Sequence, residues 1–387
     1  MGRLRVCEVV KTLDIGGTEM LLVERLRRAP KTDKAYTVVC LCASTSELID
    51  RLRDAGVTVV DLSSSPWPLG YARLVTTVRR LSPDIVNVHS PITGVVLRPF
   101  VRFGRRRPRM VSTVHSVAFR RPTMLLDRLT RGLDDQTVAV SPLVARSPTV
   151  RGARRVVTCV HGVDVQEQRH LAARADALRR EFGVPEGSFL LVSVANLRPV
   201  KNHRLLIEAA AEVLRTHPDA TLLLAGDGPL RKSVLRDVER RGLTGRVRLL
   251  GRVPEAKRLI AAADLLVLSS HYEGMPVVVM EALAAGVPVV STAVGGVPDL
   301  ITSGWNGILT EPGSPAALAL GIRQAMDPAV RRRLRSGANS TAETIDLAAT
   351  VEWFENLYDA LTVDARGRGS TTAQQKDTRR EDAMHNR

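Results

Sequence analysis

The stretch "HYEGMPVVVMEALAAG", residues 271–286, sets two acids, Glu273 and Glu281, on either side of a strongly apolar segment. It follows the run DLLVLSS (264–270), which has the composition of a buried strand. Pro276 suits the first position of a helix, where its missing N–H costs nothing. We therefore expect a strand, a loop over 271–274, and a helix that begins near Pro276.

The start of such a helix offers free N–H groups and a positive dipole end to an anion. Glu273 would lie above this end, and Glu281 would fall in the second turn. A ligand that reaches both acids and the helix end needs hydroxyl groups and a phosphate, which describes a nucleotide sugar. The alternative is a pair of solvated acids at a helix end.

The same pattern of a short apolar run followed by a helical segment recurs along the 387 residues. Alternating strands and helices indicate right-handed βαβ units and parallel sheets, so the predicted fold class is α/β, with two Rossmann-like domains facing across a cleft. Ligands of such sheets bind at the carboxyl ends of the strands. We expect strands near 4–10, 36–41, 57–61, 84–88, 110–114, 136–140, 155–160, 189–194, 220–225, 246–250, 264–268, 287–291 and 306–310.

The domain limits follow from a helix that ends in Gly183 and Pro185 just before a new strand. We assign 1–182 to an N-terminal acceptor-side domain and 183–340 to a C-terminal nucleotide-sugar-binding domain. A last amphipathic helix, 341–363, is expected to pack back toward the N-terminal domain. The polar, apolar-poor segment 364–387 is predicted to be a disordered tail.

The net charge of +16 is concentrated in the N-terminal half. Between Asp84 and Asp127 there is no acid but there are eight arginines, which form a predicted patch over Arg98–Arg121. Such a patch favours phosphate, whether in an anionic membrane, a lipid-linked phosphate or a nucleic acid; a solvated basic face is the alternative. Scarce aromatic residues and the lack of a helix-turn-helix or zinc pattern argue against nucleic acid.

No apolar run reaches the ~18 residues that a membrane-spanning helix needs, and no secretory leader is recognised at the N-terminus. The four cysteines form no CxxC pair and show no metal-ligand spacing. The expected location is the cytoplasm, with the inner membrane face as a peripheral site.

Five segments in register resemble the retaining GT-B glycosyltransferases of the GT4 family. The stretch 269–301 resembles their E-x7-E motif, "LDIGGTEMLLVERL" (13–26) their N-terminal glycine loop, and "ANLRPVKNHRLLIEAA" (195–210) their phosphate-binding segment. "LLLAGDGPLR" (222–231) and "VRLLGRV" (247–253) resemble the next two strand ends. The resemblance covers roughly residues 4–362 and implies transfer of a sugar from a nucleotide-diphosphate sugar to a glycan or lipid-linked acceptor.

The resemblance also implies roles for single residues. Glu273 and His115 are similar to the residues that contact the donor sugar, and Lys201 to the lysine that neutralises the leaving diphosphate. The family usually has arginine where this chain has Asn196, so we expect Arg198, two residues later, to supply that charge. The implied donor-binding residues are Gly16, Gly17, Asn196, Gly226, Asp227, Gly228, Val253, Gly274, Met275, Pro276 and Glu281.

His89 also follows a predicted strand and is expected on the acceptor side. The family implies transfer without a bound metal or cofactor, with Lys201, Arg198 and the helix dipole in its place, and with retention of the anomeric configuration. A UDP-sugar is the preferred donor. The alternatives are a degenerate nucleotide-sugar-binding protein and a phosphorylase or epimerase on the same fold, and Asn196 gives the first of these some support.

Overall fold

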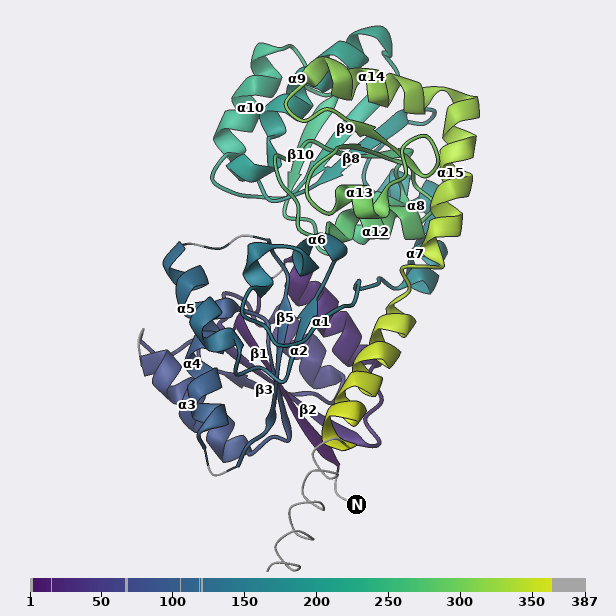
Figure 1. Ribbon diagram of the computed structural model, residues 1–387. Coiled ribbons are helices and arrows are strands. Elements are labelled where there is room, and N and C mark those ends of the chain that lie inside the picture. Colours follow the sequence, from purple (N-terminus) through teal and green to yellow (C-terminus); the bar gives the residue numbers. More distant parts are fainter. Residues whose placement is uncertain are drawn as a thin grey trace, which may run out of the picture.

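The computed structural model has two domains, each built on one parallel β-sheet flanked by helices, and the C-terminal domain lies above the N-terminal one in Figure 1. The structure describes residues 3–14, 16–66, 69–104, 106–117, 119 and 121–363. The predicted tail over 364–387 lies outside this part of the chain. No helix within the described part is both long and apolar enough to cross a bilayer.

The N-terminal sheet has seven strands in the order β3-β2-β1-β4-β5-β6-β7. The strands are β1 (Leu4–Thr12), β2 (Lys34–Cys42), β3 (Thr58–Asp61), β4 (Ile85–Val88), β5 (Arg109–Val114), β6 (Gln136–Ala139) and β7 (Val156–Thr158). The helices are α1 (Gly17–Arg28), α2 (Glu47–Asp54), α3 (Leu69–Leu81), α4 (Pro91–Arg102), α5 (Arg121–Arg131) and α6 (Pro142–Ala145).

The C-terminal sheet has six strands in the order β10-β9-β8-β11-β12-β13. Its strands are β8 (Phe189–Val194), β9 (Ala220–Ala225), β10 (Val247–Gly251), β11 (Leu265–Leu268), β12 (Val289–Thr292) and β13 (Gly307–Thr310). The helices are α7 (Val165–Ala172), α8 (Ala175–Glu181), α9 (His203–Thr216), α10 (Arg231–Arg240), α11 (Lys257–Ala261), α12 (Val277–Ala284), α13 (Val297–Leu300), α14 (Pro315–Met326) and α15 (Pro328–Ala342).

Strands such as β9 and β11 are buried along their whole length, which is why their sequences are almost entirely apolar. In each sheet the strand order reverses once, between β1 and β4 and between β8 and β11. A crevice forms at the carboxyl ends of strands where the order reverses, and ligands of doubly wound folds bind there. We therefore expect a ligand site at each of these two positions.

The domain limit at residue 182 needs a correction. Helices α7 and α8, which we had placed in the N-terminal domain, pack against the C-terminal one: Val165, Leu171 and Leu178 belong to the core that also contains Leu259 and Met280. Gly183 and Pro185 end a helix, but that helix is already the second one on the C-terminal domain. The chain leaves the N-terminal domain near residue 164, where Asp164 caps α7.

A final helix over residues 347–363 returns to the N-terminal domain, as the lower right of Figure 1 shows. Its apolar side joins the core between β1, β2 and α1 through Leu347, Val351, Phe354, Tyr358 and Leu361. The two domains are thus tied together at both ends of the C-terminal domain.

Candidate active site

An ion pair lies at the point where the strand order of the C-terminal sheet reverses. Lys201 ends a short 3-10 turn (Pro199–Lys201) after β8, and Glu273 lies in the loop after β11. Lys201 Nζ donates to Glu273 Oε1 at 2.7 Å and to Oε2 at 2.8 Å. Glu273 is 7% exposed. Two of the three residues that we expect at the reacting centre of this domain, Lys201 and Glu273, are therefore in direct contact; the third is Arg198.

The loop that carries Glu273 is held by neighbours that the sequence interpretation did not single out. Ser270 donates a 2.6 Å hydrogen bond to Glu273 Oε1. The Gly296 N–H donates to the Glu273 carbonyl at 3.2 Å. Gly295 has a φ of +55°, and a Cβ there would lie only 1.7 Å from the same carbonyl oxygen. The glycine pair of "STAVGGVPD" thus lets the loop after β12 approach the acid-bearing loop.

Helix α12 begins at Val277 with Pro276 at its N-cap, so its free N–H groups lie just beyond Gly274 and Met275. Glu281, in the second turn, has different surroundings from Glu273. Its charged neighbours are Lys257, Glu167 and Glu24, and burial raises its pKa from 4.5 to about 7 against the attraction of Lys257. The two acids of the opening motif therefore occupy separate electrostatic environments.

The loops after β8 and β9 lie against each other. Gly226 has a φ of +138°, and a Cβ there would lie 2.0 Å from the Ala195 carbonyl oxygen. The Leu197 N–H donates to the Asp227 carbonyl at 3.0 Å. The predicted residues Gly226, Asp227 and Gly228 thus shape the loop that precedes Lys201. Val253, after β10, is half-buried against the domain core.

Asn196 and Arg198 lie on this loop, on either side of the buried Leu197, and both are exposed. The Arg198 N–H donates to the Asn196 carbonyl at 2.8 Å, which holds the loop in a tight turn. Arg198 is therefore a surface cation three positions before Lys201.

The N-terminal domain meets the Glu273 loop across the cleft. Tyr272 Oη accepts a 3.2 Å hydrogen bond from the Val117 N–H. A Cβ at Gly274 would lie 2.8 Å from the His115 carbonyl oxygen, and one at Gly17 would lie 3.0 Å from a methyl of Val277. Both Gly17 and the neighbouring Gly16 precede or begin α1, so the glycine loop faces the start of α12.

Behind the cleft a chain of buried polar groups runs through the N-terminal core. Nδ1 of His89 lies 3.0 Å from Nε2 of His115, and Nε2 of His89 lies 2.8 Å from Glu8 Oε2. Glu8 Oε1 is 2.5 Å from Arg25 and accepts a 2.8 Å hydrogen bond from Tyr358. This series of hydrogen bonds connects Tyr358 of the last helix to His115, which borders Gly274.

The protonation states of these buried polar groups are set by burial and by ion pairing. Burial alone would raise the pKa of Glu8, but Arg25 and His89 outweigh it and hold that pKa at about 2. Burial, with the nearby His89, His161 and Arg25, lowers the pKa of His115 well below its ordinary value. His115 is therefore a neutral imidazole at neutral pH, able to form hydrogen bonds without carrying charge.

A hollow of about 160 Å³ opens beside His89 at the carboxyl ends of β1 and β4. Glu19 lines it and accepts a 3.0 Å hydrogen bond from Thr12, and burial raises the pKa of Glu19. Lys11, Thr18 and Ser90 complete its polar lining. The hollow is at the N-terminal reversal of strand order, where a second ligand of this fold would bind.

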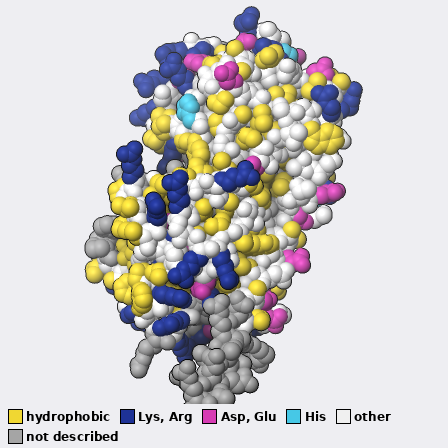
Figure 2. Space-filling view, in the orientation of Figure 1, with side chains coloured by type: hydrophobic (Ala, Val, Ile, Leu, Met, Phe, Trp, Pro, Cys, Tyr) yellow, Lys and Arg dark blue, Asp and Glu magenta, His cyan; other side chains and the backbone are white. Residues whose placement is uncertain are grey.

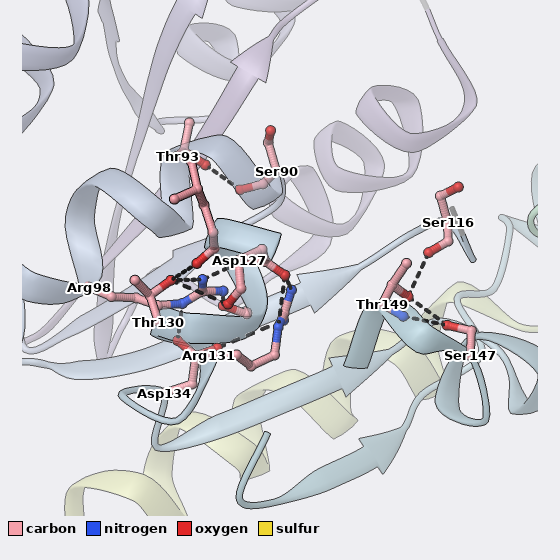
Figure 3. Close-up of polar contacts among 12 residues, drawn as sticks. Ser90, Thr93, Arg98, Ser116, Asp127, Thr130, Arg131, Asp134, Ser147 and Thr149 are labelled. Atoms are coloured by element: carbon pink, nitrogen blue, oxygen red, sulfur yellow. Dashed lines mark hydrogen bonds and ion pairs between the residues drawn. The ribbon is translucent and has the colours of Figure 1, made fainter. Parts of the chain in front are cut away.

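The predicted basic patch needs a correction, which Figure 3 makes visible. Arg98 is 1% exposed, because its guanidinium lies 2.7 Å from Asp134 and 2.7 Å from Asp127. Arg109 pairs with Asp135 at 2.9 Å. Neither is a free surface cation, and Arg105 and Arg120 lie outside the described residues. The remaining arginines of the range, Arg102, Arg106, Arg107 and Arg121, lie at least partly on the surface.

Glu8, Arg25 and Tyr358 are the largest omission of the sequence interpretation. The available signal was an acid, Glu8, in the middle of the apolar strand RVCEVV. A buried acid needs partners, and Arg25 and Tyr358 are 17 and 350 positions away.

Comparison with known proteins gives consistent matches over both domains. Residues 15–167 match the family described as "Glycosyltransferase Family 4", and residues 175–341 match "Glycosyl transferases group 1". N-acetyl-alpha-D-glucosaminyl L-malate synthase of Bacillus anthracis is 29% identical over 318 residues, which cover 78% of this chain and 82% of that protein.

The 2-deoxystreptamine glucosyltransferase of Streptomyces kanamyceticus is 28% identical over 318 residues, with 76% of this chain and 82% of that protein covered. Among solved structures, Anabaena HepE in complex with UDP-glucose superposes with a TM-score of 0.80 at 22% identity, over 92% of this chain and 100% of that one. The two-sheet architecture is the same in that structure.

Proposed function

Because the chain belongs to the GT4-type glycosyltransferases, whose two sequence families match its two domains in order, we propose that it is a retaining sugar transferase. The donor is a nucleotide-diphosphate sugar, with UDP preferred, and the acceptor is a hydroxyl group of a glycan or a lipid-linked sugar. The observation that carries this proposal is the Lys201–Glu273 pair at the reversal of strand order.

The donor binds along the C-terminal domain. Glu281 accepts hydrogen bonds from the ribose hydroxyls, and Glu273 from hydroxyls of the donor sugar. The diphosphate meets the N–H groups at the start of α12 and the ammonium of Lys201, with Arg198 as a second cation. A fixed cation stabilises the charge that develops on the diphosphate as the glycosidic bond breaks. These groups do this work without requiring a bound metal or cofactor.

In the transfer step the bond between the anomeric carbon and the diphosphate oxygen breaks, and a bond to the acceptor oxygen forms on the same face. Because the new bond forms on the face from which the diphosphate departs, the anomeric configuration is retained, and the acceptor proton passes to the leaving diphosphate. His115, neutral and bordering Gly274, hydrogen-bonds the donor sugar. The hollow beside His89 and Glu19 receives the acceptor, which supports entry from the N-terminal side.

UDP is preferred because the solved structure with the same architecture holds UDP-glucose. The relatives differ in what they glycosylate: one is an N-acetyl-alpha-D-glucosaminyl L-malate synthase and another is a 2-deoxystreptamine glucosyltransferase. The proposal therefore includes two classes of acceptor, a small polar molecule and a glycan. The hollow beside His89 and Glu19 is the region whose shape would select between them.

The test is a donor hydrolysis screen with UDP-glucose, UDP-N-acetylglucosamine, UDP-galactose and GDP-mannose, in which the released nucleoside diphosphate is recorded. Glu273→Gln runs beside the wild type, and Glu311→Gln, an exposed acid of the same domain, is the matched control. Release from one donor that is lost only in Glu273→Gln supports the proposal. No release and no thermal shift with any donor would overturn the proposal, whereas a thermal shift without release would favour a degenerate nucleotide-sugar-binding protein.

A further inference from the structure

Helix α5 buries two of its charged residues, Asp127 and Arg131, and presents three leucines to solvent. Leu125, Leu126 and Leu129 are 60%, 47% and 72% exposed, whereas Asp127 and Arg131 are 3% and 1% exposed. A surface helix of a globular protein normally shows the opposite distribution. An apolar face left in water on an otherwise well-packed domain marks a site of interaction.

The inverted orientation of α5 is fixed by ion pairs. Asp127 Oδ1 accepts from Arg98 of α4 at 2.7 Å, and Asp127 Oδ2 accepts from Arg131 Nε at 3.0 Å. Arg98 also donates to Ser112 of β5 at 3.0 Å. Turning the leucines inward would break these buried pairs, and a buried charge without its partner is strongly destabilising. The leucine face is therefore held outward.

The exposed apolar surface continues onto α4, where Phe100 and Phe103 are 46% and 78% exposed. Between the ends of α3 and α4 there is an apolar groove of about 530 Å³ with Arg79 and Arg106 at its edge. A groove of this size matches that of ordinary ligand sites. We call the exposed side chains of α4 and α5, with the arginines around them, the α4–α5 face.

The charge of this face selects among partners. Arg106, Arg107, Arg121 and Arg128 are exposed, and residues 85–126 contain no acid. In Figure 2 dark-blue and yellow side chains lie side by side on the left of the lower domain, where Figure 1 places α3, α4 and α5. A second copy of this chain would bring the same positive charge, so self-association is opposed. Apolar side chains ringed by arginines complement an anionic bilayer.

We propose that the α4–α5 face docks on the surface of an anionic bilayer. Leu125, Leu126 and Leu129 enter the boundary between head groups and acyl chains, the arginines contact lipid phosphates, and the groove beside Phe100 receives an apolar lipid chain. Helix α5 follows closely after His115 and Val117, so docking brings the acceptor side of the cleft to the membrane. Only this last consequence rests on the proposed function.

The test is vesicle sedimentation of the full chain at low salt, with phosphatidylcholine alone and with phosphatidylcholine mixed with phosphatidylglycerol. We expect the wild type to pellet with the mixed vesicles and to stay in solution with the neutral ones. The variant L125S/L126S/L129S is expected to lose about tenfold in bound fraction, and R121S/R128S a similar factor that shrinks as salt rises.

Matched controls lie on the other domain. Leu320→Ser replaces a leucine that is 50% exposed on α14, and R332S/R335S replaces two exposed arginines on α15; both are expected to bind vesicles as the wild type does. Melting temperature and hydrolysis of a soluble donor report the fold and the transferase reaction independently, so loss of vesicle binding with intact hydrolysis separates the two proposals. Wild-type protein that ignores the mixed vesicles would overturn the docking proposal. A dimer in solution that L125S/L126S/L129S dissociates would also overturn it.

Discussion

Lys201 Nζ lies 2.7 Å and 2.8 Å from the two carboxylate oxygens of Glu273. The cation comes from the segment after β8 and the acid from the loop after β11, so the pair joins the two strands at which the strand order reverses. The lysine neutralises an acid that is almost completely buried. A donor that places its diphosphate beside Lys201 therefore meets a cation already held in position.

Lys201→Met is expected to lower kcat for donor turnover by about 10²–10³-fold, because the charge on the leaving diphosphate loses its fixed cation. Steady-state assays of nucleotide release measure this. Lys232→Met, which removes an exposed lysine of α10 in the same domain, is expected to keep wild-type turnover. Equal activity in the two variants would show that Lys201 does not act on the diphosphate.

A paired substitution separates catalysis from stability. Lys201→Met leaves Glu273 buried with Ser270 as its remaining side-chain partner, and an unpaired buried charge is costly. Lys201→Met/Glu273→Gln removes both charges and is expected to melt at a higher temperature than Lys201→Met while remaining inactive. Recovery of activity in the double variant would contradict the assigned roles.

Arg198→Ala tests the cation two positions beyond Asn196. The side chain is exposed, so the melting temperature should stay unchanged while donor affinity falls about tenfold through the loss of a charge-assisted contact to phosphate. Arg335→Ala, on the exposed side of α15, is the control. Asn196→Arg combined with Arg198→Ala is expected to restore binding, because it returns a guanidinium to the same loop. An unchanged Kd in Arg198→Ala, measured by calorimetry, would exclude Arg198 from the site.

The raised pKa of Glu281 predicts that the affinity for UDP depends on pH. Its pKa is raised to about 7 in the folded protein, so the carboxylate that we propose as the acceptor for the ribose hydroxyls forms as pH rises through 7. UDP affinity is expected to strengthen between pH 6 and pH 8, and Glu281→Gln is expected to bind weakly with no such trend. Calorimetric titrations at both pH values measure this.

The same shift sets a trend in stability. An acid whose pKa is higher in the folded state holds a proton that the unfolded chain releases, so stability falls as pH rises from about 4.5 to about 7. Glu281→Gln removes this loss and should raise the melting temperature of the ligand-free protein at pH 8 more than at pH 5. An equal change at both pH values would contradict the raised pKa.

Glu8→Gln is expected to destabilise the protein by about 3–5 kcal/mol at neutral pH, because Arg25 stays buried without its partner. The pKa of Glu8 is held at about 2, below its unfolded value, so its stabilisation is present above pH ~4.5 and is lost as pH falls toward 2. The gap between wild type and variant in denaturant melts should therefore close at acid pH. Glu47→Gln, which removes an exposed partner of Arg51, should change stability by less than about 1 kcal/mol.

The alternation of apolar runs and helical segments was enough to predict the fold. All thirteen expected strands are present in the described chain, with ends that differ by at most two residues, because strands buried on both faces are predominantly apolar. The position of Glu273, Lys201 and His115 at strand ends followed from the same rule. Local patterns such as Pro276 before EALAAG likewise predicted the start of α12.

Features that depend on distant partners could not be predicted in this way. Arg98 looks like a surface cation in sequence, and only the fold brings Asp127 and Asp134 around it. The domain limit was displaced because α7 and α8 have ordinary amphipathic patterns, which do not say which core they cover. The raised pKa of Glu281 likewise depends on residues of α7 and α11 that are distant in sequence.

The crossing between the domains is made of two segments that run side by side. The Val163 N–H donates to the Ile345 carbonyl at 2.9 Å, and the Leu347 N–H donates to the Val163 carbonyl at 2.9 Å. Two linkers that are hydrogen-bonded to each other restrict twisting and sliding of one domain against the other more than a single linker would. Rotation of the domains about the axis of the paired linkers remains the least restricted motion. We therefore expect a hinge motion in which the two domains rotate about the paired segments. The Tyr272–Val117 contact, which lies away from this hinge, would break when the cleft opens.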